Sequence, residues 1–219
     1  MTVHVAVLFS GGKDSCYAAG WALAQGYDIV LVTMNPEPYS MMFHHPNVQW
    51  TKLQAEAMGI KQVMVTTKHD TELNDLEETL RKLKIGAIAT GAVASVYQKD
   101  RIEAIGKRLG VPVHSPLWHS DEKKLHELLD TMEIYVVAVA AEGLGREFLG
   151  KPLRKLVDAK VKNIHPFLEG GEGETFVTNA PFFKKRIEIK GWKISWDGVR
   201  GVAEIEDAGL VEKEKKKTK

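Results

Sequence analysis

Residues 3–15 read VHVAVLFSGGKDS, an apolar run that ends in a polar, glycine-rich turn. Nearly every side chain from Val3 to Phe9 is apolar, which is typical of a parallel β-strand covered by helices on both faces. The turn comes directly before a helical stretch at 13–25, and it consists of Ser10, Gly11, Gly12, Lys13, Asp14 and Ser15. These residues therefore predict a strand, a tight loop and a helix, which is the first half of a β-α-β unit.

The first half of the chain continues this alternation of strands and helices. Further strands are expected at 28–33, 61–66 and 87–90, and further helices at 47–58, 72–83 and 98–109. Such an order predicts an α/β fold with a doubly wound parallel sheet, whose ligands bind at the carboxyl ends of the strands. Glycines 26, 59 and 110 follow the predicted helices, where a left-handed C-cap is wanted.

The alternation ends around residues 112–118, and a helix at 121–132 and a strand at 134–140 follow. Beyond Gly143 we expect a helix at 153–161 and short antiparallel strands at 183–190, 192–196 and 199–206. We therefore predict a large domain over 1–118, a small α+β domain over 119–211, and a charged, disordered tail over 212–219. A domain boundary near residue 140 is the alternative.

The composition of the chain excludes several classes of partner and site. The 219 residues are 44% hydrophobic and 27% charged, and the formal net charge is +1 without a strong basic stripe, so nucleic acid is not an expected partner. The single cysteine, Cys16, excludes an internal disulfide and a paired-cysteine zinc site. We find no signal peptide and no long apolar segment, so the chain is expected to be cytoplasmic and not to interact with a membrane.

The turn at 10–15 has the chemistry of a phosphate-binding loop. Two glycines let the backbone approach an anion closely, and a helix start presents N–H groups and the positive end of its dipole. The loop departs from the Walker pattern, because Asp14 stands where a Ser or Thr would hold magnesium. The alternative is a glycine-rich turn whose Ser or Asp caps the helix.

Two further segments carry polar groups. The first follows the fourth predicted strand, beside the expected ligand edge, and contains Gly91, Ser95, Tyr97, Gln98 and Arg101. Its other interpretation is a turn in which Ser95 caps a helix and Arg101 is solvated. The second segment is acidic and flexible, suited to magnesium or a cationic substrate, and contains Glu169, Gly170, Gly171, Glu172, Glu174 and Thr175. An acidic surface turn or a helix start is the alternative there.

The loop at 10–15 matches the Ser-Gly-Gly-x-Asp-Ser loop of the PP-loop ATP pyrophosphatases residue for residue. The three segments together resemble the diphthine:ammonia ligase family, also called diphthamide synthase. That family combines this loop with Gly-x-x-x-Ser-x-Tyr-Gln-x-x-Arg, here residues 91–101, and with Glu-Gly-Gly-Glu-x-Glu-Thr, here 169–175. Residues 116–118, Pro-Leu-Trp, agree as well, and the resemblance runs from the first strand to about residue 190.

This resemblance implies ATP and Mg²⁺ as cofactors and free ammonium as the nitrogen donor. The substrate would be diphthine on translation elongation factor two, amidated through an acyl-adenylate with release of AMP and pyrophosphate. We predict nucleotide contacts from residues 10–15 and Gly91, catalytic roles for Lys13 and Asp14, and Asp14 as a metal ligand. The polar residues of 95–101 and 169–175 are predicted to bind the substrate, whose quaternary ammonium group suits an acidic loop and the rings of Tyr97 or Trp118.

Rival interpretations are another PP-loop enzyme, such as a tRNA-modifying ligase, or a sensor that binds ATP without cleaving it. The weak basic balance and the absence of a second cysteine disfavour the first rival. A homo-oligomer is left open, because nothing in the sequence bears on it.

Overall fold

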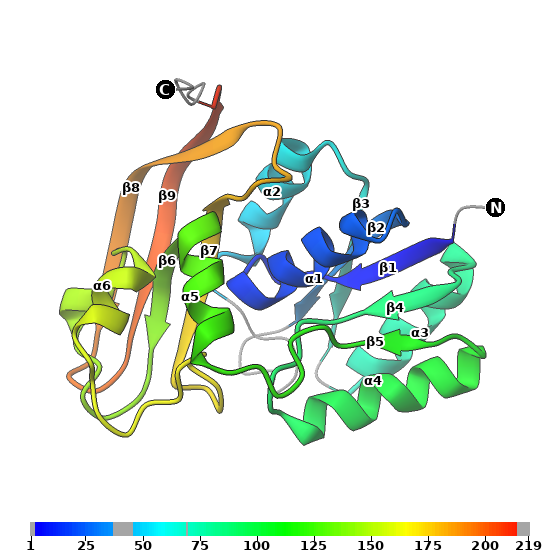
Figure 1. Ribbon diagram of the computed structural model, residues 1–219, viewed down its shortest axis with the longest axis horizontal. Helices are drawn as coiled ribbons and strands as arrows, with labels where there is room; N and C mark the ends of the chain where they lie inside the picture. Colours follow the sequence, from blue (N-terminus) through cyan, green and yellow to red (C-terminus); the bar gives the residue numbers. More distant parts are fainter. Residues whose placement is uncertain (1–2, 37–45, 69, 214–219) are drawn as a thin grey trace.

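The computed structural model describes residues 3–36, 46–68 and 70–213. Its first half is a parallel sheet of five strands in the order β3-β2-β1-β4-β5. The strands are β1 (His4–Leu8), β2 (Asp28–Pro36), β3 (Gln62–Thr67), β4 (Ala87–Ala89) and β5 (Val113–His114). Because all five run the same way, their carboxyl ends meet at one edge, where the loop at residues 10–12 follows β1 (Figure 1).

Helices cover both faces of this sheet. They are α1 (Lys13–Ala24), α2 (Thr51–Met58, preceded by the 3₁₀ turn η1, Val48–Trp50), α3 (Glu72–Leu83) and α4 (Val96–Leu109). Alternate residues of β1 face opposite sides: Val5 and Val7 share a core with α1 and α2, whereas Ala6 shares one with α3 and α4. The predicted doubly wound α/β fold is therefore confirmed.

The second half of the chain forms an antiparallel sheet in the order β7-β6-β9-β8, which lies beside the parallel sheet (Figure 1). Its elements are α5 (Glu122–Thr131), β6 (Glu133–Val139), η2 (Arg146–Phe148), α6 (Leu153–Asp158), β7 (Gly173–Asn179), β8 (Arg186–Trp196) and β9 (Gly201–Val211). One hydrophobic core runs from β1 and α1 into α5, β6 and β7. The two sheets are thus packed around a shared interior.

The structure corrects three expectations about single elements. Residues 186–196 form one long strand, whose irregular pairing around Gly191 explains the expected break between two short strands. The helix expected over 153–161 ends at Asp158. Residues 173–179 form β7, although neither a strand nor a place in the second sheet was expected for them.

Other predictions agree with the structure. Gly59 and Gly110 are left-handed C-caps, and Gly26 also has a positive φ of 77°. Among the described residues, no helix is long and apolar enough to cross a membrane. The domain boundary at residue 118 falls between β5 and α5 and stays a prediction, and most of the expected tail, 214–219, lies outside the described residues.

Candidate active site

The loop that connects β1 with α1 is folded around the side chain of Ser15. The Ser15 hydroxyl accepts the backbone N–H groups of Gly11 at 3.1 Å and Ser10 at 3.3 Å, and it donates to the Gly12 carbonyl at 3.1 Å. Gly11 has a φ of 84°, a conformation that residues with a Cβ rarely adopt. Gly12 is the N-cap of α1 and supplies no side chain to it. The loop therefore reaches the helix without a local side-chain cap.

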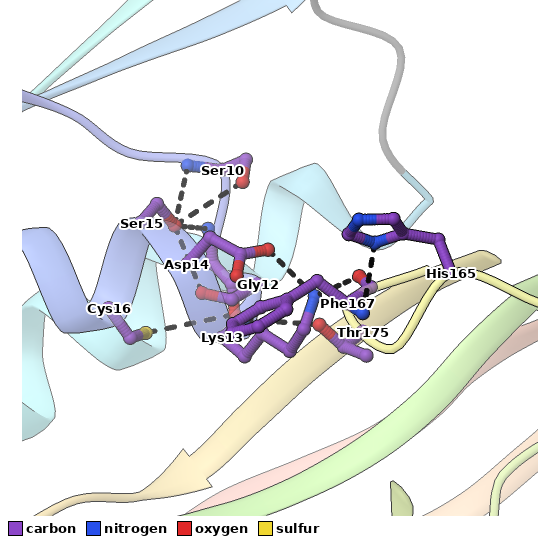
Figure 2. A network of polar contacts seen from close by, with 10 residues as sticks. Ser10, Gly12, Lys13, Asp14, Ser15, Cys16, His165, Phe167 and Thr175 are labelled. Carbon is purple, nitrogen blue, oxygen red and sulfur yellow. Dashed lines mark hydrogen bonds and ion pairs between the residues drawn. The ribbon is translucent and has the colours of Figure 1, made fainter. Parts of the chain in front are cut away.

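Lys13 and Asp14, the first residues of α1, form an ion pair beside this loop (Figure 2). The Lys13 ammonium lies 2.8 Å from Asp14 Oδ2 and 2.6 Å from the carbonyl oxygen of Phe167. Only 3% of the Lys13 side chain is exposed, compared with 23% for Asp14. The second carboxylate oxygen, Asp14 Oδ1, is buried and has no hydrogen-bond partner within residues 3–36, 46–68 and 70–213.

Strand β7 supports the loop from the second sheet. The Thr175 hydroxyl accepts the backbone N–H of Lys13 at 3.1 Å, so it caps the first turn of α1 across 162 residues of sequence. Two residues further along the strand, the Val177 N–H donates to the Gly11 carbonyl at 3.0 Å. The third predicted segment is therefore part of the phosphate-loop structure.

The second predicted segment also meets the loop. A Cβ on Gly91, just beyond β4, would lie 2.5 Å from the carbonyl carbon of Asp14 and 2.7 Å from the nitrogen of Ser15. Only glycine lets this backbone pass so close to the start of α1. In addition, the backbone of Ala94 lowers the pKa of the Glu169 carboxyl group, so the second segment lies close to the third. All three segments converge on residues 13–15.

Within the acidic segment the carboxylates lie in different surroundings. The charge of Glu174 raises the pKa of both Asp14 and Glu169, so these three carboxyl groups lie near one another. Glu172 is placed differently, because its Oε2 accepts the backbone N–H of His165 at 2.8 Å. Gly170 and Gly171 have positive φ angles of 72° and 81° and form the turn. The helix start considered for this segment is wrong, because the β-branched and aromatic residues 175–178 favour the strand that forms.

Three of the polar residues at the start of α4 contact residues of the same helix. The Ser95 hydroxyl is the N-cap and accepts the backbone N–H of Gln98 at 3.4 Å. The Arg101 guanidinium lies 3.3 Å from the centre of the Tyr97 ring, and Lys99 lies 5.0 Å from the ring of Trp118. Each of the two rings proposed to hold a substrate cation therefore already contacts a cation of the chain.

Burial raises the pKa of three groups in and beside the phosphate loop. Removal from water raises the pKa of Asp14, an effect that Lys13 opposes and Glu174 reinforces. The pKa of Glu169 is raised by burial and then by the neighbouring charge of Asp14. Burial also raises the pKa of the Cys16 thiol well above its usual value. Cys16 is fully buried in α1, as expected, and is not activated as a nucleophile.

The donor set fits a magnesium ion that arrives with a nucleotide. Among the described residues there is no group of three His, Cys, Asp or Glu side chains able to hold a metal. Mg²⁺ commonly uses one or two carboxylates together with substrate phosphates and water. The buried oxygen Asp14 Oδ1, for which the described residues supply no hydrogen-bond partner, is a carboxylate oxygen of the kind that such an ion uses.

Two important residues were missed by sequence reasoning. Gln54 is completely buried and donates to the carbonyls of Gly11 and Val177, and Phe167 supplies the carbonyl that binds Lys13. A signal for Gln54 existed, because residues 51, 54, 55 and 58 form the buried stripe of α2 with helical spacing. Polar residues in an apolar stripe indicate a buried hydrogen-bonding role. Nothing in the sequence singled out a backbone carbonyl at 167.

An α/β sheet with a Ser-Gly-Gly-Lys-Asp-Ser loop between its first strand and first helix defines the PP-loop class of ATP-binding proteins. The match to known families is more specific. Residues 3–113 match the diphthamide synthase N-terminal domain, and residues 120–211 match the diphthamide synthase C-terminal domain. The chain belongs to the diphthamide synthase family.

Two diphthine–ammonia ligases agree with this assignment. A diphthine–ammonia ligase of Bos taurus is 34% identical, with 85% of this chain and 83% of the bovine protein covered. The chain is 33% identical to the diphthine–ammonia ligase of Schizosaccharomyces pombe, with 83% of this chain covered, but it spans only 35% of that longer protein. A solved structure described as a "predicted subunit of tRNA methyltransferase" from Methanocaldococcus jannaschii is 19% identical, with a TM-score of 0.49, covering 81% of this chain and 97% of that one.

Proposed function

We propose that this chain amidates the carboxylate of diphthine on translation elongation factor two, using ATP and free ammonium. The carboxylate attacks the α-phosphorus of ATP, and the bond to pyrophosphate breaks as the acyl-adenylate forms. Ammonia then attacks the acyl carbon, AMP leaves, and a proton is lost from nitrogen. The observation that carries this proposal is the convergence of all three family segments on residues 13–15, through Gly91, Glu169 and Thr175.

The nucleotide side of the reaction is assigned to the loop at 10–15 and to Gly91. We propose that the Gly12 N–H, at the positive end of α1, donates to the β- and γ-phosphates. Ser15 accepts the N–H groups of Ser10 and Gly11 and thereby keeps the loop in shape. The Lys13 ammonium carries three N–H donors, of which two have acceptors among the described residues. The third is available to a phosphate oxygen, where it would stabilise the charge that develops on pyrophosphate.

Asp14 is the proposed ligand of the magnesium ion, through its unpartnered oxygen Oδ1. Such an ion would neutralise negative charge on the phosphates. Lys13 holds the other oxygen, Oδ2, and thereby orients the carboxylate. Burial raises the pKa of Asp14, and the charge of Lys13 opposes this shift, as a bound cation also would.

The substrate side is assigned to the other two segments, with 1–118 as the nucleotide-binding domain and 119–211 as the substrate-binding domain. Diphthine carries a quaternary ammonium group, and the carboxylates of Glu169 and Glu174 offer the opposite charge near Asp14. The Glu172 side chain also accepts the backbone N–H of His165 and so supports the turn there.

Tyr97, from the second segment, remains 45% exposed and is thus accessible to a protein substrate. The other proposed substrate contacts are Ser95, Gln98, Arg101, Gly170, Gly171 and Thr175.

Free ammonium is the proposed nitrogen donor, because release of ammonia from glutamine needs an activated nucleophile such as a cysteine thiolate. The chain has one cysteine, Cys16, whose thiol is buried and whose pKa is raised. We place the reaction in the cytoplasm, where such a thiol stays reduced.

The proposal is tested by measuring AMP formation from Mg-ATP with the diphthine-bearing elongation factor and ammonium, added together and singly. We expect AMP only when both are present. AMP release that is independent of the elongation factor would contradict the substrate assignment, and glutamine serving as well as ammonium would contradict the nitrogen source. Little AMP under any condition would indicate a protein that only binds ATP.

The same assay tests the role of Lys13. Lys13→Ala should lower kcat by about 10²–10³-fold, because a donor aimed at developing charge is lost. The matched control is Lys82→Ala on the surface of α3, where the lysine side chain is 72% exposed. Near-normal turnover of a folded Lys13→Ala protein would refute the role.

A further inference from the structure

Gln54 of α2 lies outside the three family segments, and its side chain is bonded to the phosphate loop itself. It is completely buried, and its Nε2 donates to the Gly11 carbonyl at 2.9 Å and to the Val177 carbonyl at 2.8 Å. Both neighbours are carbonyl oxygens, so the nitrogen of the amide must face them. The other amide atom, Gln54 Oε1, is buried and has no hydrogen-bond partner in the part of the chain that the structure describes.

The Gly11 carbonyl is consequently saturated. It accepts Gln54 Nε2 and the Val177 N–H at 3.0 Å, which occupy both lone pairs of a carbonyl oxygen. The Cys16 thiol adds a weak contact at 3.8 Å. This carbonyl therefore has a fixed direction, toward α2 and β7.

Fixing the carbonyl also fixes the next amide. In a planar trans peptide unit the C=O and the following N–H point in opposite directions, so the Gly12 N–H points away from Gln54 and β7. A peptide between two glycines can rotate at little steric cost, because glycine populates positive and negative φ about equally. A rotated peptide would turn the carbonyl oxygen to the side where the Gly12 N–H now points, and it would repel an anion there.

We propose that Gln54 is a positioning residue, which holds the Gly11–Gly12 peptide so that the Gly12 N–H donates to a terminal phosphate of the nucleotide. This inference rests on the proposed function, because it takes the loop as the binding site of the β- and γ-phosphates. It adds a residue from α2 to the site. The strand that binds the other side of the same carbonyl, β7, comes from the second sheet.

The test compares the binding of ATP, pyrophosphate and AMP to Gln54→Met, which keeps the length of the side chain but has no N–H donor. We expect ATP and pyrophosphate to bind about 10- to 100-fold more weakly, the range for one lost hydrogen bond to a charged group. AMP, which lacks the β- and γ-phosphates, should bind as in the wild type. Equal losses for AMP and ATP, or no loss for pyrophosphate, would overturn the proposal.

Gln62→Met is the matched control. Gln62 also donates two hydrogen bonds through its amide, at 2.8 Å to each of the hydroxyls of Thr33 and Thr51, and neither acceptor belongs to the phosphate loop. This variant should keep the affinity of the wild type for pyrophosphate. The same loss in both variants would mean that a general loss of buried hydrogen bonds, and not the direction of one peptide, weakens binding.

A second variant decides the matter if Gln54→Met does not fold. Gln54→Glu keeps the shape and has one O–H donor only while the carboxyl group is protonated. Its affinity for pyrophosphate, relative to that of the wild type at the same pH, should fall as the pH rises through the pKa of the new carboxyl group. A constant ratio would contradict the proposal. If the wild type binds ATP no more tightly than AMP and does not bind pyrophosphate, the proposed function fails first.

Discussion

The N-termini of α1 and α5 are stabilised in opposite ways. At α5 the side chain of Asp121, the N-cap, accepts the backbone N–H of Lys124 at 3.2 Å, so donor and acceptor are three residues apart. At α1 the N-cap is Gly12, and the N–H of Lys13 is instead accepted by Thr175, 162 residues later. Each helix has an acidic residue in its first turn, so charge does not distinguish them.

The difference shows how this fold leaves a helix end open for a ligand. A capping side chain occupies the N–H groups that an anion would otherwise bind. At α5 the N-cap residue itself supplies that side chain, whereas at α1 the N-cap is Gly12 and the supporting side chains are Ser15 of the helix, Thr175 of β7 and Gln54 of α2. The start of α1 therefore depends on contacts with residues that are distant in the sequence. The following variants test that dependence, from the largest expected effect to the smallest.

Gly91→Ala should disturb the start of α1 most strongly. Its Cβ would lie 2.5 Å from backbone atoms of Asp14, and overpacking of this kind costs about 1–3 kcal/mol. Because the shift moves the phosphate loop, we also expect kcat/KM for ATP to fall about 10²-fold. Gly209→Ala is the control, since its Cβ would meet only the flexible end of Lys190 at 3.8 Å. Normal activity of Gly91→Ala would show that the close approach does not matter.

Thr175→Val should remove the distant cap of α1 while keeping the shape of the side chain. We expect the free energy of unfolding to fall by about 1 kcal/mol and kcat/KM for ATP by about tenfold, the equivalent of about 1.4 kcal/mol. Thr175→Ser should restore both. Thr178→Val, on the same strand and also buried, removes only bonds of 3.4 Å to Glu133 and should not change activity. Equal activities of the two valine variants would contradict the role of Thr175.

Asp121→Ala should have the smallest effect on function. The loss of a local N-cap lowers the free energy of unfolding by about 1 kcal/mol, which urea or thermal denaturation can measure. The KM for ATP should be unchanged, because the side chain of Asp121 caps α5 within its own sequence, by accepting the backbone N–H of Lys124. A change in ATP affinity that matched the change in Thr175→Val would erase the distinction between the two helix ends.

Much of the first half could be predicted because its signals are local. The strand at 3–9, the loop at 10–15 and the C-caps at Gly59 and Gly110 each depend on residues a few positions apart. Strand β7 was missed because its acidic, glycine-rich start is typical of a surface turn. The ladder with β6 that makes it a strand involves residues about 40 positions away.

The sequence by itself determined the parallel sheet, the phosphate loop and the three family segments, since periodicity and short motifs are properties of neighbouring residues. Only the tertiary structure decided which groups surround the loop: the hydroxyl of Thr175, the amide of Gln54 and the carbonyl of Phe167. It also decided that the pKa of Asp14 is raised. Hydrogen-bond direction and desolvation depend on atoms brought together from distant parts of the chain, and no local pattern encodes their positions.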